Sequence, residues 1–209
     1  MIDYRVYLVT DDPSRYAGNW LDNVRAAVEG GVTCVQYRDT ESAAKVQYER
    51  ILALRDAIGL TPIIVNNDAL LAKAVKAEGV HVGQGDMPPD EVRAIVGEEC
   101  EIGLSITAIG QLPSINRAVV DLIGIGPVFD ARKTKSDAAA AMGPEGLGEI
   151  ARRVPDLPNC AIGGITLANA AEVLAAGARG LAVVSAFSKS EDPYEVAKAF
   201  RMLFDDCRQ

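Results

Sequence analysis

The sequence predicts an α/β protein with a (β/α)8 TIM barrel of parallel strands, and three observations support this. Eight short apolar runs alternate with helical patterns along 209 residues, with no linker or low-complexity break. Glycines join helix ends to new strands, as at Gly31, Gly79 and Gly177. Polar side chains, by contrast, follow the carboxyl ends of the strands, on the face where barrel active sites form. We therefore expect a single TIM-barrel domain spanning residues 1–209.

The elements follow from the alternation of short apolar runs with longer helical patterns. The expected strands are Val6–Thr10, Val32–Tyr37, Pro62–Asn66, Gly79–Val82, Ile102–Ser105, Leu122–Gly126, Ala161–Gly163 and Leu181–Ser185. The expected helices are Leu21–Glu29, Ala43–Ile58, Ala69–Lys76, Pro89–Val96, Leu112–Ala118, Pro144–Arg153, Ala168–Ala176 and Pro193–Phe204. A doubly wound sheet is the second choice, because no G-x-G-x-x-G follows the first strand.

Composition excludes several classes of function. A net charge of −8 leaves no basic face for nucleic acid, although a few local cations can still hold a small anion. No apolar run approaches the ~18 residues of a membrane span, and the start of the chain lacks a signal-peptide pattern. The four cysteines are scattered, which argues against zinc or a disulfide framework. We expect a cytoplasmic enzyme with no membrane partner.

Two stretches near the C-terminus indicate a phosphorylated ligand. Gly163 and Gly164 follow the seventh expected strand, and Ser185 ends the eighth. Glycine lets backbone N–H groups approach an oxyanion closely, and the loops after strands 7 and 8 of a barrel commonly bind phosphate.

Further polar residues close the second to fourth strands. Gln36 and Arg38 alternate onto one side of their strand, and an Arg can grip phosphate bidentately; the alternative is a surface Arg paired with Asp39. Asn66, Asn67, Asp68 and Asp86 follow the next two strands, where amide and carboxylate oxygens could hold Mg²⁺. The alternatives are that Asp68 caps a helix and that Asp86 only ends a turn.

The remaining candidates are one histidine, one serine and one long loop. His81 lies inside an apolar strand, which favours a hydrogen-bonded structural histidine over a general base. Ser105 ends the fifth strand and has no base nearby in sequence, so a serine nucleophile is not supported. The loop after the sixth strand carries Arg132, Lys133 and Lys135, a positive cluster suited to a lid over an anion.

Taken together, these segments resemble the thiamine-phosphate synthase family over nearly the whole chain. The order and spacing of the motifs are more specific than any one of them. They are Tyr7-Leu-Val-Thr-Asp11, Gly30-Gly-Val-Thr-Cys-Val-Gln-Tyr-Arg38, Ile64-Val-Asn66, Gly79-Val-His-Val-Gly-Gln84, Gly103-Leu-Ser105, Gly124-Ile-Gly-Pro-Val-Phe129, Thr134-Lys135, Ala161-Ile-Gly-Gly-Ile165 and Val183-Val-Ser-Ala186.

The resemblance implies a Mg²⁺-dependent transferase acting on two small phosphorylated substrates. It would join 4-amino-5-hydroxymethyl-2-methylpyrimidine diphosphate to hydroxyethylthiazole phosphate and release pyrophosphate, through a dissociative pyrimidine-methyl cation. The implied catalytic residues are Lys135, Arg38 and Ser105, and the implied Mg²⁺ ligands are Asp86 and Asn67. The implied substrate-binding residues are Gln36, Arg38, Thr40, Asn66, Ser105, Arg132, Lys133, Thr134, Lys135, Gly164, Val184 and Ser185. The resemblance also allows a homo-oligomer.

The chain departs from the family pattern at four places. Asn67 stands where the family usually has Asp, Gly85 where it has Glu, and Thr40 where it often has Lys. The Pro-Thr-x-Thr-Lys loop becomes Asp130-Ala-Arg-Lys-Thr-Lys135, one residue longer. An uncharged Asn67 implies weaker Mg²⁺ binding. Two alternatives therefore stay open: a TenI-like thiazole tautomerase, and a degenerate regulatory barrel that binds thiazole phosphate without catalysis.

Overall fold

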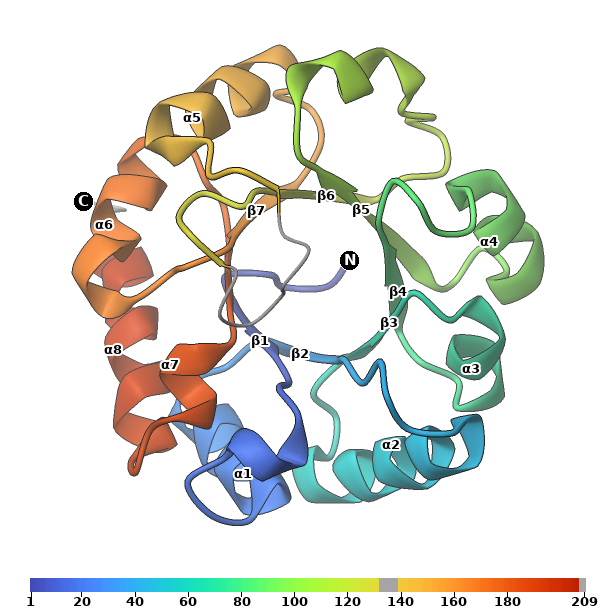
Figure 1. Cartoon of the computed structure of the whole chain (residues 1–209), viewed down its shortest axis with the longest axis vertical. Coiled ribbons are helices and arrows are strands. Elements are labelled where there is room, and N and C mark those ends of the chain that lie inside the picture. The colour runs from blue at the N-terminus through green and yellow to red at the C-terminus, as the bar shows by residue number, and fades with distance from the viewer. Residues whose placement is uncertain (132–138, 207–209) are drawn as a thin grey trace.

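The computed structural model describes residues 1–131 and 139–206 and confirms the predicted barrel. All eight strands are parallel, and each pairs with its neighbours in chain order. Pairing of the first strand with the last, with Leu8 opposite Val183, closes the ring seen in Figure 1. The strands are β1 (Val6–Val9), β2 (Cys34–Tyr37), β3 (Ile63–Asn66), β4 (Gly79–Val82), β5 (Glu101–Ile106), β6 (Leu122–Ile125), β7 (Asn159–Ile162) and β8 (Leu181–Val183).

Helices surround the strands as an outer layer (Figure 1). They are α1 (Trp20–Gly30), α2 (Ala44–Ile58), α3 (Ala69–Ala74), α4 (Pro89–Val96), α5 (Gly143–Arg153), α6 (Leu167–Ala175), α7 (Ser185–Ser188) and α8 (Pro193–Asp206). Two 3₁₀ turns accompany them, η1 (Pro13–Arg15) and η2 (Ile109–Ser114). Among the helices described, none is both long and apolar enough to cross a membrane.

At two places the structure has a different type of element from the one predicted. The helix expected over Leu112–Ala118 is wrong, because the 3₁₀ turn η2 contains Pro113 and ends at Ser114. Asn116 then turns its side-chain oxygen to the N–H of Ala118, a local bond that competes with helix formation. The eighth strand ends at Val183 rather than Ser185, and Ser185 begins the unpredicted short helix α7.

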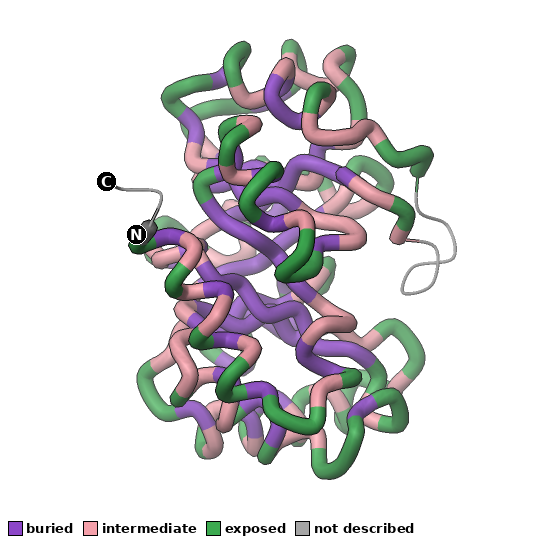
Figure 2. Tube along the Cα trace, turned by 90° about the vertical axis from the view of Figure 1, so that its left-hand side faces the viewer, coloured by how far each residue is buried: buried purple, intermediate pink, exposed green. Residues whose placement is uncertain are grey.

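The core has two parts, which appear as the buried centre of Figure 2. The larger part lies between strands and helices. The smaller part fills the inside of the barrel with side chains that include Tyr7, Cys34, Leu122 and Cys160. Burial raises the pKa of Cys160 to about 12, so this thiol stays neutral, as expected for a small buried apolar residue.

Tyr4 closes the amino end of the barrel interior. Its hydroxyl donates to Glu101 Oε2 at 2.9 Å, and its ring meets the Tyr7 ring edge-on at 5.4 Å between centroids. The buried polar residues Gln36 and His81 lie nearer the other end of the barrel, where the strands finish.

Candidate active site

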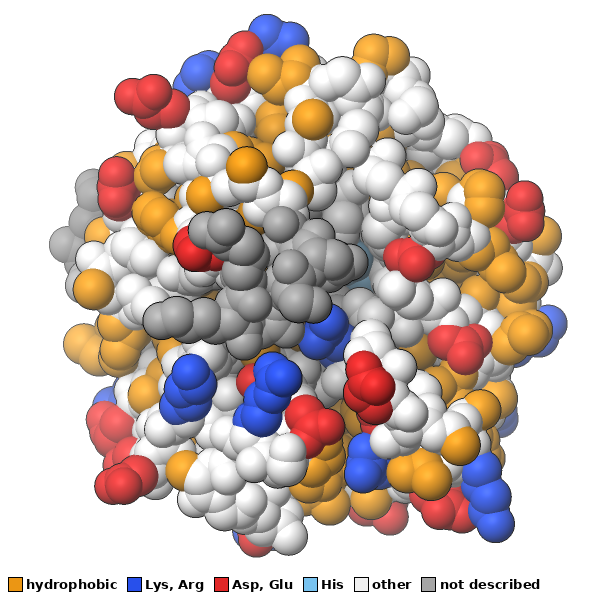
Figure 3. Space-filling view, viewed as in Figure 1, with side chains coloured by type: hydrophobic (Ala, Val, Ile, Leu, Met, Phe, Trp, Pro, Cys, Tyr) orange, Lys and Arg blue, Asp and Glu red, His pale blue; other side chains and the backbone are white. Residues whose placement is uncertain are grey.

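The carboxyl ends of β2 to β5 bring the predicted polar side chains to one end of the barrel (Figure 1). Asn66 of β3 lies opposite His81 of β4, whereas Gln36 of β2 lies opposite Ile64, two residues before Asn66. Figure 3 looks onto this end and shows Lys and Arg side chains on one side of it, with Asp and Glu side chains among them. Positive side chains are therefore present at the end of the barrel where an anion is expected, although the chain as a whole is acidic.

Gln36 lies inside the barrel, near the end of β2. Its side chain is 3% exposed, and its Nε2 donates to the hydroxyl of Tyr7 at 2.6 Å. Burial raises the pKa of Tyr7 well above its usual value, so the hydroxyl stays protonated. Tyr7 therefore fixes the orientation of the Gln36 amide at the floor of the candidate site.

Arg38 follows β2, and the Thr10 hydroxyl contacts both its backbone N–H and its carbonyl oxygen. The Arg38 N–H donates to Thr10 Oγ1 at 2.9 Å, and the Thr10 hydroxyl lies 3.3 Å from the Arg38 carbonyl oxygen. The alternative pairing of Arg38 with Asp39 is wrong, because Asp39 Oδ2 binds Arg50 Nη1 at 2.7 Å. Within the described residues, the Arg38 guanidinium has no hydrogen bond or ion pair, which leaves its donors for a ligand.

The Asp39–Arg50 pair gives a prediction about acid stability. Burial raises the pKa of Asp39, but hydrogen bonds from the Ser42 and Glu41 N–H groups and the Tyr37 hydroxyl outweigh it and lower the pKa to about 2. A carboxyl with a lowered folded-state pKa stabilises the fold above its unfolded value, near 3.8.

We expect Asp39→Asn to cost about 1 kcal/mol at neutral pH, after allowance for solvent screening. This difference should shrink as the pH falls from about 4 toward about 2, since the wild-type carboxylate is protonated there. Urea unfolding of both proteins at several pH values measures it. A difference that stays constant over this range would contradict the assigned pKa.

The end of β3 carries three polar side chains in different environments: Asn66, Asn67 and Asp68. Asn66 is half-buried at the last strand position, whereas Asn67 is exposed and has a left-handed φ of 63°. The Asn67 N–H donates to the His81 carbonyl oxygen at 2.8 Å, which fastens this turn to β4. Asp68 Oδ1 accepts from the Leu71 N–H at 2.8 Å, so the alternative that Asp68 caps a helix is confirmed.

Asp86 shapes the loop after β4. Its Oδ2 accepts from the Gly83 N–H at 2.7 Å, so it has the turn-ending contact considered from sequence. The half-buried carboxylate keeps a second oxygen, and β4 pairs directly with β3, which leads into Asn67. Mg²⁺ is usually held by one or two carboxylates together with phosphate oxygens and water, so one carboxylate and one amide oxygen suit it.

No larger cluster of metal ligands accompanies Asp86. Over residues 1–131 and 139–206, the structure places no group of three or more His, Cys, Asp and Glu side chains to hold a metal ion. The hard-cation site proposed from sequence is therefore a sparse one among the described residues.

His81 and Ser105 share a hydrogen bond inside the barrel, as the structural interpretation of His81 expects. Nε2 and Oγ lie 2.9 Å apart, and the Ser105 carbonyl accepts from Gln84 Nε2 at 2.7 Å. Space for the imidazole comes from two glycines. A Cβ on Gly103 would lie 2.3 Å from Nδ1, and one on Gly124 would lie 3.0 Å from Cε1.

Sequence reasoning missed that these two glycines make room for the His81 ring. Glycine in the interior of adjacent strands, here β5 and β6, is the signal that could have found them, since it marks close approach of another group. The gap they leave lets His81 orient the Ser105 hydroxyl.

The predicted phosphate-binding glycines follow β7 and pack against the loop after β6. Gly163 and Gly164 have φ values of 99° and 66°. Added Cβ atoms would lie 2.6 Å from Pro127 Cβ and 2.7 Å from Phe129 Cβ, so only glycine fits at either position. Asn169 Nδ2 donates to the Gly164 carbonyl at 3.0 Å and ties this turn to α6.

Val184 and Ser185 lie beside these glycines, because β8 pairs with β7. Val184 precedes α7, and Ser185 is its first residue. The structure thus brings the sequence-predicted residues after β7 and β8 to the same end of the barrel as Arg38.

A family model described as thiamine monophosphate synthase matches residues 6–187. The chain belongs to the thiamine monophosphate synthase family. The thiamine-phosphate synthase of Albidiferax ferrireducens is 41% identical over 203 residues, covering 96% of this chain and 92% of that protein. The thiamine-phosphate synthase of Azorhizobium caulinodans is 40% identical, covering 99% and 98%. The solved thiamine phosphate pyrophosphorylase of Pyrococcus furiosus superposes with a TM-score of 0.86 at 30% identity, covering 98% and 96%.

The structure assigns no substrate contact to several residues that the family resemblance implicates. Arg132, Lys133, Thr134 and Lys135 lie outside the described residues. Thr40 is exposed, and its hydroxyl lies 3.4 Å from Glu41 Oε1. The substrate contacts of this set remain predictions from the family pattern.

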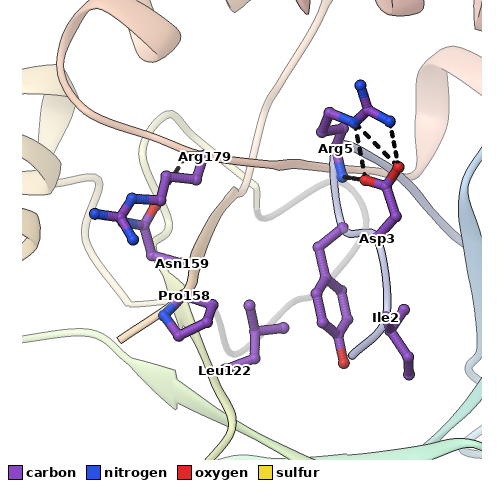
Figure 4. Close-up of a pocket in the computed structure, with 8 residues that line it drawn as sticks. Ile2, Asp3, Arg5, Leu122, Pro158, Asn159 and Arg179 are labelled. Carbon is purple, nitrogen blue, oxygen red and sulfur yellow. Dashed lines mark hydrogen bonds and ion pairs between the residues drawn. The ribbon is translucent and has the colours of Figure 1, made fainter. Parts of the chain in front are cut away.

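A cavity of about 330 Å³ opens at the other end of the barrel, where the strands begin. Figure 4 shows the residues that line it. Its walls are Ile2, Asp3, Tyr4, Arg5, Leu122, Pro158, Asn159 and Arg179. Asp3 already holds Arg5, with Arg5 Nη2 2.5 Å from Asp3 Oδ2, which neutralises much of the charge there. This cavity is separate from the candidate active site, so it serves as a comparison site for anion binding.

Proposed function

We propose that this protein condenses 4-amino-5-hydroxymethyl-2-methylpyrimidine diphosphate with hydroxyethylthiazole phosphate to give thiamine phosphate and pyrophosphate. The observation that carries the proposal is a pair of anion-binding features at one barrel mouth. Arg38, with unpaired donors within the described residues, follows β2, and the Gly163–Gly164 turn follows β7. The names and near-complete coverage of the relatives support the same activity, which we place in the cytoplasm.

In the proposed reaction, the chain holds two substrates and excludes water. Arg38, Gln36, Asn66 and Lys135 bind the pyrimidine diphosphate, and Ser105, oriented by His81, meets the pyrimidine. Gly164, Val184 and Ser185 hold the thiazole phosphate. The bond between the pyrimidine methylene and the diphosphate oxygen breaks, and its electron pair leaves with pyrophosphate. The thiazole nitrogen then donates its lone pair to the pyrimidine-methyl cation, so no protein nucleophile is required.

Asp86 and Asn67 would hold Mg²⁺ beside the diphosphate. When bound, the ion offsets the negative charge that grows on the departing diphosphate. Asp86 supplies the one carboxylate, and its contact with Gly83 keeps the loop in position. Asn67 supplies a neutral oxygen, so the charge opposite the cation is lower than with the family's usual Asp.

We expect Asn67→Asp to tighten Mg²⁺ binding about tenfold, since it adds a charged ligand without changing size. Aspartate tolerates the left-handed φ of 63° that this position requires. Calorimetric titration of the protein with Mg²⁺ and pyrophosphate measures the change. The matched control, Asn19→Asp, adds the same charge while preserving the cap of α1 and should leave the titration unchanged.

An assay with both purified substrates and Mg²⁺ tests the proposed function. We expect equal amounts of thiamine phosphate and pyrophosphate to form. Conversion of a thiazole substrate without pyrophosphate release would instead favour the TenI-like tautomerase. Binding of thiazole phosphate without turnover would favour the regulatory barrel.

A further inference from the structure

Asp11 is a buried carboxylate with no part in the proposed reaction. It lies two positions after β1, and its side chain is 3% exposed. Taking a carboxylate out of water is costly unless hydrogen bonds replace the lost hydration. Here Oδ1 accepts from the Asp12 N–H at 3.0 Å and from Arg15 Nη1 at 3.2 Å. Oδ2 accepts from the Ser188 hydroxyl at 3.3 Å, from the far end of the chain.

The contact with Ser188 is one of several that join the β1–α1 segment to the last residues of α7. Ser188 is fully buried, and its carbonyl accepts from the Ala17 N–H at 3.1 Å. Asn23 Nδ2 donates to the Phe187 carbonyl at 3.3 Å. The final carbonyls of a helix lack partners within the helix, so these neighbours complete its hydrogen bonding.

A helix as short as α7 does not hold its own geometry, because a single turn is unstable alone. The position of Ser185–Ser188 must come from what it contacts. Within the turn, the N–H groups of Phe187 and Ser188 donate to the Val184 carbonyl at 3.1 and 3.2 Å. A shift of Ser188 would therefore carry Val184 with it.

We propose that Asp11 is a positioning residue for the thiazole-phosphate end of the site, which it sets through Ser188 and the α7 turn. The inference rests on the proposed function for the identity of the ligand. It assigns Asp11 no contact with substrate. The effect passes along the path Asp11, Ser188, Val184, each step being a hydrogen bond given above.

The negative charge of Asp11 and its hydrogen bond to Ser188 are expected to have opposite effects on phosphate binding, so two substitutions can distinguish them. A buried negative charge acting directly on the phosphate would weaken phosphate binding, and its removal would tighten it. Asp11→Asn removes the charge but keeps an oxygen that can accept from Ser188. Asp11→Ala removes the charge and the acceptor together. If positioning dominates, the Asn variant stays near the wild type and the Ala variant does not.

Steady-state kinetics with each substrate varied in turn tests this assignment. We expect Asp11→Ala to raise KM for the thiazole phosphate about tenfold or more, and KM for the pyrimidine diphosphate less than about twofold. Ser188→Ala should raise the same KM by about threefold or more, and the double variant should match Asp11→Ala. Ser14→Ala, exposed in the same loop, is the control and should change neither value.

Hydrogen exchange of the ligand-free protein gives a readout that does not depend on activity. Amides of residues 184–190 should exchange faster in Asp11→Ala and Ser188→Ala than in the wild type and Ser14→Ala. If exchange responds in this way but the wild type makes no thiamine phosphate, the proposed function fails and the positioning stands. Unchanged exchange at 184–190, equal rises in both KM values, or tighter thiazole-phosphate binding in Asp11→Asn would overturn the proposal. Should Asp11→Ala not fold, Ser188→Ala carries the same test.

Discussion

Replacement of Asp86 by asparagine is expected to lower turnover by about 100-fold while leaving the fold intact. The new side chain keeps an oxygen that can accept from the Gly83 N–H, so the loop after β4 retains its hydrogen bond. What it loses is the one carboxylate charge proposed to face Mg²⁺, and mutations that remove charge stabilisation of this kind cost about 10²–10³ in rate. Turnover measured over a range of Mg²⁺ concentrations, with thermal unfolding of both proteins, gives the result.

Asp68→Asn provides the matched control for this experiment. Asp68 is a carboxylate at the end of the neighbouring strand, but its Oδ1 caps α3 by accepting from Leu71. Asparagine caps a helix about as well as aspartate, so this variant should keep its turnover and its Mg²⁺ requirement. Near-normal rates in Asp86→Asn, or equal losses in the two variants, would remove Asp86 from the site.

Gly103→Ala is expected to produce the largest combined loss of stability and activity. The added methyl group would lie 2.3 Å from His81 Nδ1, in a ring that Gly124 also confines. Overpacking of this kind costs about 1–3 kcal/mol, and displacement of the imidazole removes the partner that orients Ser105. We expect turnover to fall at least about tenfold, with KM for the pyrimidine diphosphate raised. Urea unfolding and kinetics of the purified variant measure both losses.

The control substitution lies in the loop after β4. Gly85 has no atom within 4 Å of the position that a Cβ would occupy, so Gly85→Ala should be tolerated without loss of stability. If Gly103→Ala is equally well tolerated, the imidazole does not need the space that these glycines provide.

The fold was predictable because the signal repeats eight times. Each strand is a short run of apolar residues buried on both sides, and each run is followed by a helix, so errors at one element do not change the topology. The predicted elements were wrong where local side-chain interactions outweigh the pattern of apolar residues. Pro113 and Asn116 replaced a helix by a 3₁₀ turn, and the contacts from the β1–α1 segment produced α7, which no sequence period predicts.

The sequence predicted where several polar side chains lie, but not which residues they contact, and the functional assignment of the site stays a prediction. The position of His81 inside an apolar strand correctly predicted a hydrogen-bonded histidine, although the sequence could not name Ser105 as its partner or Tyr7 as the partner of Gln36. The alternative pairing of Asp39 with its sequence neighbour Arg38 is wrong, because its partner Arg50 comes from α2, eleven positions later in the chain. Such pairs depend on three-dimensional packing, which a single sequence does not encode locally.

The glycines illustrate the same division between pattern and packing. Gly163 and Gly164 stood out because they are adjacent at a strand end, and their left-handed φ values confirm that the backbone there requires glycine. Gly103 and Gly124 did not, because each is single within an apolar strand. Only the structure shows that the His81 ring packs closely against both of them.

A crystal structure with pyrophosphate and Mg²⁺ bound is the most direct test of the central claim, that the carboxyl-end mouth of the barrel holds the phosphorylated substrates. We predict the anion within hydrogen-bond distance of the Arg38 guanidinium, with the cation on Asp86. Pyrophosphate seated instead in the cavity between Arg5 and Arg179, at the opposite end of the barrel, would contradict the account.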